Sequence, residues 1–161
     1  MRRPRLGIIP GDPSGIGPEL IAKLLQEPAV LAQADVLLIG DAHLWEVGAK
    51  QAGLPLSLET VDEANLSLGF TLAHLDLETI AAEDVQIAKV TQASGNSALR
   101  CLDKALDLAQ SNTIDGILFA PLNKAALTLA GLNAEDEHRY MARYLGFEGY
   151  HSEINVLDAL M

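Results

Sequence analysis

The sequence predicts an α/β fold with a parallel β-sheet, and three observations support this prediction. Short apolar segments alternate with segments of helical periodicity along the chain. Two of the apolar segments, at 34–40 and 115–120, are nearly continuous, as expected for strands covered on both faces of a parallel sheet. The long segment between these two carries one apolar stripe at helical spacing, made by Ala98, Cys101, Leu102, Ala105, Leu106 and Ala109.

The first predicted strand is Leu6–Pro10, and a helix is expected from Pro18 to about Pro28. Pro18 suits the first helical position, where its missing N–H needs no intrahelical partner. Glu19 follows at the positive end of the helix dipole, which favours a carboxylate. A turn rich in glycine and proline separates the strand from this helix, so the junction is the first candidate site.

The remaining elements follow from the same two patterns. The second strand is Ala34–Gly40, followed by a helix near His43–Ala52. The long amphipathic helix within 91–110 is expected to take its cap from Ser94 or Ser97. The other predicted elements are weaker strands at Leu54–Leu58 and Phe70–Leu77, a strand at Asp115–Ala120, helices at Lys124–Leu129 and Asp136–Leu145, and a strand at Ile154–Leu157.

Composition narrows the class of protein. The chain has 161 residues, which suits one domain without an internal boundary. Its net charge of −11 disfavours a nucleic-acid-binding surface, and no run approaches the roughly 20 apolar residues of a membrane span. The single cysteine, Cys101, lies on the apolar helix stripe and is expected to be a core residue. We therefore expect a cytoplasmic protein that binds neither nucleic acid nor membrane.

The glycine-rich segment 10–19 (PGDPSGIGPE) lies where ligands collect in α/β sheets, after the carboxyl end of a strand. It is not a Walker A loop, and it lacks the third glycine of the dinucleotide fingerprint. Gly15 and Gly17 would still permit close backbone approach, and the helix start beyond them offers free N–H groups to an anion or polar ligand. A tight connection with no ligand is the alternative.

Two further segments carry candidate anion-binding side chains. Lys124 is expected just inside a helix start, an unfavourable place for a cation unless an anionic ligand is nearby; a lysine reaching into water is the alternative. Residues 135–139 (EDEHR) combine three carboxylates with His138 and Arg139, which could bind a phosphate or carboxylate or simply form a solvated face. The remaining histidines, His43, His74 and His151, show no metal-ligand spacing.

With these segments identified, the chain resembles the 4-hydroxythreonine-4-phosphate dehydrogenase family of pyridoxal phosphate biosynthesis. The resemblance rests on PGDPSGIGPE at 10–19, on APLNKAAL at 120–127, and on EHRY at 137–140, where the family has Gly-His-Thr-Glu. The EDEH and NVLD segments are more similar to the branch that oxidises 4-phosphorylated threonate or erythronate. The resemblance implies a three-layer αβα fold of the isocitrate and isopropylmalate dehydrogenase type.

The resemblance also implies a chemistry and a set of site residues. The family oxidises an alcohol with NAD and a divalent cation (Zn, Mg, Co or Mn), releases CO2, and acts as a homodimer on a small phosphorylated substrate. His138, Arg139 and Lys124 would bind substrate, and the loop with Asp12, Gly15, Gly17 and Glu19 would border the site. Asp12 and Glu19 are expected to stabilise the loop and the helix start.

The family's metal-binding histidines lie beyond the last residue of this sequence, so neither a metal ligand nor a catalytic residue is expected in it. We expect residues 1–161 to be the N-terminal portion of a longer dehydrogenase, inactive alone, with an exposed sheet edge. Two alternatives stay open: an enzyme acting on 4-phosphohydroxy-L-threonine, and a non-catalytic binding module of the same fold. Arg139, in place of the family's threonine, favours an acidic substrate over an amino-bearing one.

Overall fold

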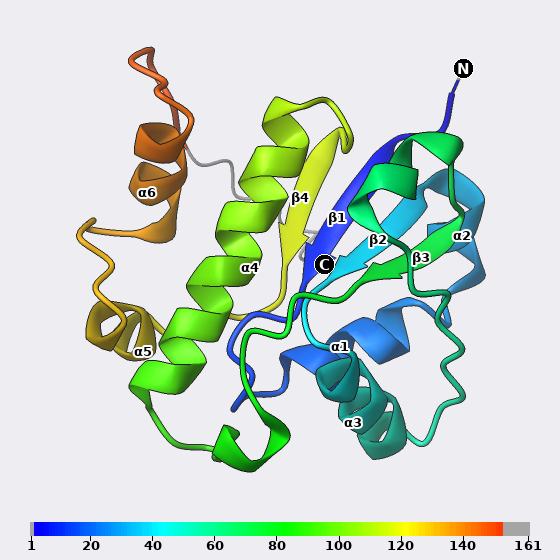
Figure 1. Cartoon of the computed structure of the whole chain (residues 1–161), viewed down its shortest axis with the longest axis horizontal. Coiled ribbons are helices and arrows are strands. Elements are labelled where there is room, and N and C mark those ends of the chain that lie inside the picture. The colour runs from blue at the N-terminus through cyan, green and yellow to red at the C-terminus, as the bar shows by residue number, and fades with distance from the viewer. Residues whose placement is uncertain (1, 153–161) are drawn as a thin grey trace, which may run out of the picture.

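A four-stranded parallel β-sheet forms the centre of the molecule (Figure 1). The computed structural model describes residues 2–152, except for the side chains of Ser67 and Leu68. The strands are β1 (Arg5–Ile9), β2 (Asp35–Ile39), β3 (Leu72–Leu75) and β4 (Gly116–Phe119), arranged in the order β3-β2-β1-β4. Each matches a predicted strand, so the prediction of a parallel α/β fold is confirmed. The strand predicted at Ile154–Leu157 lies outside the described residues.

Helices cover both faces of this sheet (Figure 1). They are α1 (Gly17–Leu24), α2 (Pro28–Gln33), α3 (Ala42–Ala52), α4 (Gln92–Gln110), α5 (Lys124–Leu129) and α6 (Glu137–Tyr144), with short 3-10 helices η1 (Glu63–Leu68) and η2 (Ala82–Asp84) in the connections. Side chains alternate along each strand, so Ile8 packs towards α1 and α3 while Ile9 packs towards α4. The sheet therefore has a separate apolar cluster on each face.

The larger cluster lies under α4. Cys101, Leu102, Ala105 and Leu106 of α4 are at most 1% exposed and pack against β1, β2 and β3. Burial, the largest effect, raises the pKa of the Cys101 thiol to about 12. The prediction that Cys101 is a core residue is confirmed.

Two predictions about local structure were wrong, and α2 was not predicted. Thr91, not Ser94 or Ser97, caps α4: its hydroxyl accepts a hydrogen bond from the Ser94 N–H at 3.0 Å, and both serines lie buried inside the helix. The segment Leu54–Leu58 is not a strand, because only the later Thr60 forms a parallel bridge, with His74 of β3. Pro28, predicted only to end a helix, also begins α2.

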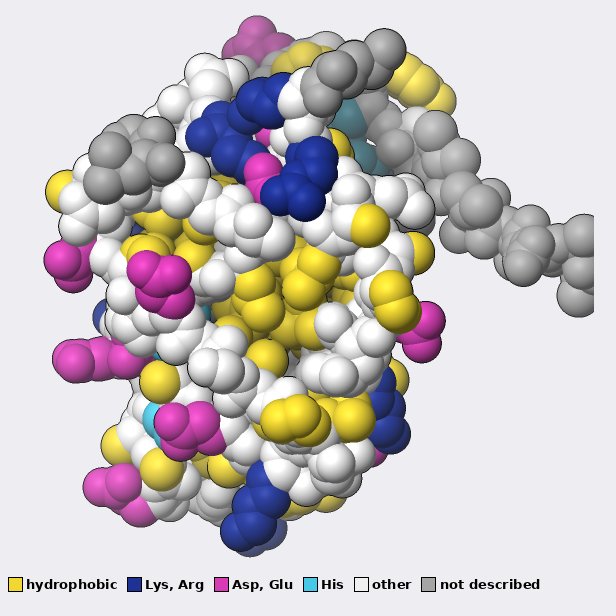
Figure 2. Space-filling model, turned by 90° about the vertical axis from the view of Figure 1, so that its right-hand side faces the viewer, with side chains coloured by type: hydrophobic (Ala, Val, Ile, Leu, Met, Phe, Trp, Pro, Cys, Tyr) yellow, Lys and Arg dark blue, Asp and Glu magenta, His cyan; other side chains and the backbone are white. Residues whose placement is uncertain are grey.

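The segment Leu54–Leu58 nevertheless covers the second cluster. Leu56 and Leu58 pack on it together with Val30, Leu31 and Leu72. Figure 2 looks onto this side of the molecule and shows apolar side chains in a hollow at its centre. The alternation of half-buried leucines produced the strand pattern in the sequence, although the backbone there makes no ladder.

β4 forms one edge of the sheet. It pairs with β1 on one side, and the described residues provide no strand on its other side. Leu118 and Phe119 of β4 are each 36% exposed. No helix among residues 2–152 has the length and apolar character needed to cross a membrane.

Candidate active site

The loop after β1 is held by its own side chains and by the loop after β4. The Asp12 carboxylate is 7% exposed and accepts a hydrogen bond from the Ser14 N–H at 2.9 Å. The Asp12 N–H donates to the Pro121 carbonyl at 3.0 Å, so the two loops lie side by side at the carboxyl edge of the sheet. Glu19 pairs with Lys23 at 2.6 Å, one turn further along α1. Both carboxylates thus have the structural contacts expected of them.

Two glycines allow this loop to turn back against the sheet. Gly11 has a φ of +73°, in the left-handed region that favours glycine. A Cβ atom at Gly17 would lie 1.9 Å from the Pro10 carbonyl oxygen, far inside van der Waals contact. Gly15 is different, because a Cβ there would come no closer than 3.3 Å to the Asp12 carbonyl oxygen. Gly17 therefore permits close packing of the loop, whereas Gly15 is exposed.

Buried hydroxyl groups attach the loop to α4. The hydroxyls of Ser14 and Ser94 lie 2.7 Å apart, and both side chains are at most 2% exposed. The Ser94 hydroxyl also lies 2.8 Å from the Thr91 hydroxyl. The serine that the sequence suggested as a helix cap thus orients the glycine loop instead.

The loop after β4 ends at Lys124, the first residue of α5. Asn123 caps this helix, because its side-chain oxygen accepts a hydrogen bond from the Ala126 N–H at 3.2 Å. Lys124 is consequently the first residue of α5, as predicted. Its charge acts on Asp136, the residue that caps α6.

Asp136 is the point around which the predicted substrate-binding residues gather. Its carboxylate accepts a hydrogen bond from the Arg139 N–H at 2.8 Å, and this bond is the main cause that lowers its pKa. The positive charges of Arg139, His138 and Lys124 lower the pKa of Asp136 further. Lys124 thus lies near enough to the start of α6 for its charge to act on Asp136, although 12 residues lie between Lys124 and Glu137 in the sequence.

A hollow of about 720 Å³ lies beside the start of α6. Its wall includes His138, Arg139, Arg143 and His151, and the rings of the two histidines meet edge to face at 4.7 Å. Arg139 pairs with Glu135 at 3.0 Å, while Arg143 donates to the Asn133 carbonyl at 2.6 Å. Two guanidinium groups and two imidazoles in this wall suit a phosphate or carboxylate ligand, and the Asp136 carboxylate lines the same hollow.

The glycine loop and α6 do not line one common cavity among the described residues. Gly15 lines a separate apolar cleft of about 210 Å³, together with His43, Val47, Val85 and Ile87. This cleft adjoins the start of α1. The predicted site therefore consists of two parts, an apolar cleft at the glycine loop and a hollow lined by cationic side chains at α6.

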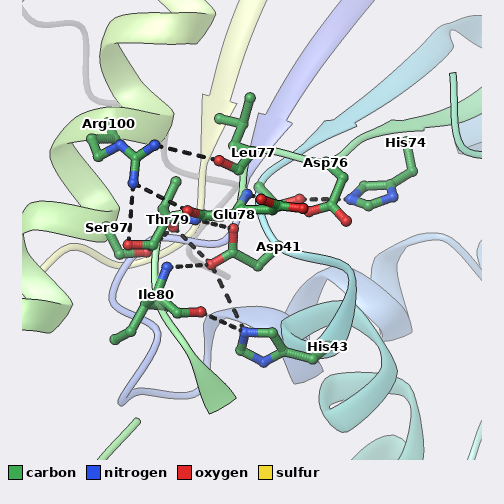
Figure 3. Close-up of polar contacts among 11 residues, drawn as sticks. Asp41, His43, His74, Asp76, Leu77, Glu78, Thr79, Ile80, Ser97 and Arg100 are labelled. Atoms are coloured by element: carbon green, nitrogen blue, oxygen red, sulfur yellow. Dashed lines mark hydrogen bonds and ion pairs between the residues drawn. The ribbon is translucent and has the colours of Figure 1, made fainter. Parts of the chain in front are cut away.

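The sequence interpretation missed a polar network at the end of β2 (Figure 3). The Asp41 carboxylate, 2% exposed, accepts hydrogen bonds from the Thr79 N–H, the Thr79 hydroxyl and the Ile80 N–H at 2.5, 2.8 and 2.8 Å. The Thr79 hydroxyl also lies 2.6 Å from that of Ser97, and Arg100 donates to the backbone carbonyls of residues 77–79. A Gly-Asp pair directly after a buried strand was the signal that could have revealed this network.

His43 connects this network to the apolar cleft. Its Nε2 atom lies 2.9 Å from the Ile80 carbonyl and 3.8 Å from Asp41 Oδ2 (Figure 3). Within residues 2–152, no three histidine, cysteine, aspartate or glutamate side chains form a group that could hold a metal ion. The donors described here thus do not fit the metal that the family resemblance implies.

Comparisons with known proteins assign the chain and its fold to a family. The family model "Pyridoxal phosphate biosynthetic protein PdxA" matches residues 32–160. The chain therefore belongs to the PdxA family, a family of α/β dehydrogenases, and the predicted fold of the isocitrate and isopropylmalate dehydrogenase type is confirmed.

Individual relatives agree with this assignment. The chain is 39% identical to a Pseudomonas aeruginosa protein provisionally named 4-hydroxythreonine-4-phosphate dehydrogenase 2, over 98% of this chain and 47% of that one. It is also 39% identical to a D-threonate 4-phosphate dehydrogenase of Cupriavidus necator, over 88% of this chain and 43% of that one. A crystal structure of a 4-hydroxythreonine-4-phosphate dehydrogenase from Burkholderia phymatum superimposes with a TM-score of 0.82 at 29% identity, covering 92% of this chain and 46% of that one. The chain spans about half the length of the curated relatives it matches.

Proposed function

We propose that the protein catalyses NAD-dependent oxidative decarboxylation of a 4-phosphorylated hydroxy acid, of the 4-phospho-D-threonate or 4-phospho-D-erythronate type. The observation that carries the proposal is that His138 and Arg139 line one hollow with Asp136, while Lys124 is near enough for its charge to act on Asp136. These three cationic or protonatable side chains come from two helices and stand beside the carboxylates of Glu135, Asp136 and Glu137 in a chain whose net charge is −11. The three side chains suit a substrate with both a phosphate and a carboxylate.

Each of these residues has a distinct part in binding. Arg139 can present two parallel N–H groups to a phosphate or carboxylate, and its partner Glu135 is an exposed side chain that an anion can displace. Lys124 adds a point charge from the loop after β4. His138 precedes Arg139 in the first turn of α6 and would supply a ring nitrogen for a hydrogen bond with a substrate oxygen.

In this reaction the carbon that bears the substrate hydroxyl transfers a hydride to NAD, and the hydroxyl loses its proton. The product is a β-keto acid, which loses CO2 as the electron pair of the broken C–C bond moves into an enolate. A bound divalent cation (Zn, Mg, Co or Mn) would supply Lewis-acid stabilisation of the oxygen anion. Gly15 and the apolar cleft beside it offer a surface for a flat apolar ring of NAD.

The same proposal includes the setting in which the enzyme works. The protein would act in the cytoplasm as a homodimer, with the second half of the family's length completing each site. The competing enzyme assignment is 4-phosphohydroxy-L-threonine dehydrogenase of pyridoxal phosphate synthesis. The competing non-enzymatic assignment is a binding module that retains the fold without the chemistry.

Substrate preference and turnover test these assignments. NADH formation is measured by absorbance for 4-phospho-D-threonate, 4-phospho-D-erythronate and 4-phosphohydroxy-L-threonine, with the protein encoded by the complete gene and each divalent cation in turn. We expect the two hydroxy acids to give the higher kcat/KM, and Arg139→Thr to shift preference towards the amino-bearing substrate. The control variant Lys50→Thr, at an exposed position on α3, removes one cation that lies outside the hollow. Absence of NADH formation from every substrate rejects the dehydrogenase and favours the binding module.

A further inference from the structure

Two tyrosines attach α6 to α4. The Tyr140 hydroxyl donates to Asp103 Oδ1 at 2.5 Å, and the Tyr144 hydroxyl donates to Asp107 Oδ1 at 2.9 Å. Both tyrosines are on α6 and both aspartates are on α4, and each pair of like residues is four positions apart. Residues four apart lie on one face of a helix, so the two bonds form successive rungs between the two helices.

These bonds matter because α6 has little apolar packing of its own. All residues of α6 are described, and Ala142 is the one that is buried. Tyr140 and Met141 are only partly buried against the cluster under α4. Figure 1 shows α6 lying at the side of α4, away from the sheet. The position of α6 is therefore determined to a large extent by the tyrosine hydroxyls.

The rungs also fix the direction in which the candidate substrate-binding side chains point. A helix turns by about 100° per residue, so Arg139 and Arg143 project about 100° away from Tyr140 and Tyr144. Two contacts one turn apart prevent both rotation of α6 about its axis and sliding along it. Any rotation would swing Arg139 and His138 relative to Lys124, which is fixed on a different helix.

The two tyrosine hydroxyls keep their protons near neutral pH and can therefore donate to the two aspartate carboxylates. Burial, followed by the bond to Asp103, raises the pKa of Tyr140, and burial followed by the bond to Asp107 raises the pKa of Tyr144 to about 12. Burial also raises the pKa of Asp103, and the bond from Tyr140 opposes that effect. Without the hydroxyl of Tyr140, the half-buried Asp103 carboxylate would lose its donor, which favours displacement of α6 into water.

We propose that Tyr140, through Asp103, is a positioning residue that sets His138 and Arg139 against Lys124 for substrate binding, with Tyr144 and Asp107 as the second rung. The inference rests on the proposed function, because it assigns a role within the same site. It goes beyond that function in tying substrate affinity to a contact between α6 and α4 that does not touch the substrate.

Steady-state kinetics of the protein encoded by the complete gene tests the inference, with the phosphorylated hydroxy acids and NAD. Tyr140→Phe should raise KM for the phosphorylated substrate roughly fivefold, the size of one lost hydrogen bond, while kcat and KM for NAD change less than about twofold. Asp103→Asn keeps an acceptor for the hydroxyl and should restore most of the affinity that Asp103→Leu loses. In the Asp103→Leu background, Tyr140→Phe should add nothing further.

The control variant is Glu63→Gln. Glu63 Oε2 pairs with Lys104 Nζ on α4 at 2.7 Å, so this change removes a contact of α4 that does not involve α6. An unchanged KM in Tyr140→Phe, or an equal increase in Glu63→Gln, rejects the positioning role. Tyr144→Phe, at a more exposed position, gives the same test if Tyr140→Phe does not fold. Absence of turnover in the wild-type protein rejects the proposed function itself; turnover with unaltered KM in the tyrosine variants rejects only the positioning role.

Discussion

The carboxylate of Asp41 accepts hydrogen bonds from both the backbone N–H and the hydroxyl of Thr79, at 2.5 and 2.8 Å. These bonds join the end of β2 to the segment that follows β3, although the two residues are 38 positions apart. Since Asp41 is 2% exposed, water cannot replace these bonds without opening the structure.

Asp41→Asn should therefore destabilise the fold. In asparagine an NH2 group replaces one carboxylate oxygen, and this group cannot accept a hydrogen bond. At least one buried N–H or O–H donor would then lose its acceptor, so we expect the free energy of unfolding to fall by about 1–3 kcal/mol. Urea denaturation, monitored by circular dichroism, measures this change in the free energy of unfolding. Asp76→Asn, at an exposed position after β3, is the control and should stay within about 0.5 kcal/mol of wild type. Equal effects of the two substitutions would contradict the role assigned to Asp41.

The glycine loop offers a matched pair of substitutions. Gly17→Ala places a methyl group 1.9 Å from the Pro10 carbonyl oxygen and should lower the free energy of unfolding by about 3 kcal/mol. Gly15→Ala, with its nearest contact at 3.3 Å, should cost less than about 1 kcal/mol. The midpoint of thermal unfolding distinguishes the two. Similar midpoints would show that the loop backbone moves freely, against the packing described.

Cys101 provides a probe of core opening. Because its thiol is fully buried and its pKa is raised to about 12, we expect almost no reaction with a disulfide reagent at pH 8 in the native protein. Reaction should become complete when denaturant unfolds the chain, and no other cysteine can contribute to the signal. Rapid labelling under native conditions would contradict the packing of α4 on the sheet.

Asp136 should make part of the stability depend on pH. Its pKa in the fold is lowered, so its contribution is present above the unfolded value of about 4 and is lost as the pH falls through the folded pKa. Asp136→Asn retains a capping oxygen for α6 but loses the charge. We expect the variant to show a smaller loss of thermal stability than wild type between about pH 4 and pH 2.

Asp136→Ala separates the cap from the charge. Alanine cannot accept the hydrogen bond from the Arg139 N–H, so the midpoint of unfolding should be lower at every pH. If Asp136→Asn and wild type lose stability in parallel below pH 4, the charge of Asp136 has no part in the acid sensitivity.

The sequence predicted most elements because their signals are local. Continuous apolar runs marked β2 and β4, and α5 and α6 begin within one residue of the positions predicted for them. The errors arose where a tertiary contact decided the outcome. Ser94 suited a cap by type, but its hydroxyl is used by Ser14, 80 residues earlier, and Thr91 takes the capping position.

The candidate site was predictable only as three separate segments. Nothing in the spacing of Lys124 and Arg139 shows that both charges act on Asp136, because that proximity depends on how α5 and α6 pack. The sequence likewise contains no sign that the site is divided into an apolar cleft at Gly15 and a cationic hollow at His138. The Gly-Asp pair after β2 could have marked Asp41 as a candidate, but its three hydrogen-bond donors belong to residues 79 and 80, and their proximity to Asp41 depends on the tertiary fold.

Helix α4 forms hydrogen bonds with three separate parts of the molecule. Ser94 of α4 contacts the glycine loop, Ser97 and Arg100 contact the segment after β3, and Asp103 and Asp107 contact α6. A helix is stiff along its axis, because each turn is hydrogen-bonded to the next. We therefore expect a displacement of α4 to move both the glycine loop and α6, which would couple the two parts of the candidate site.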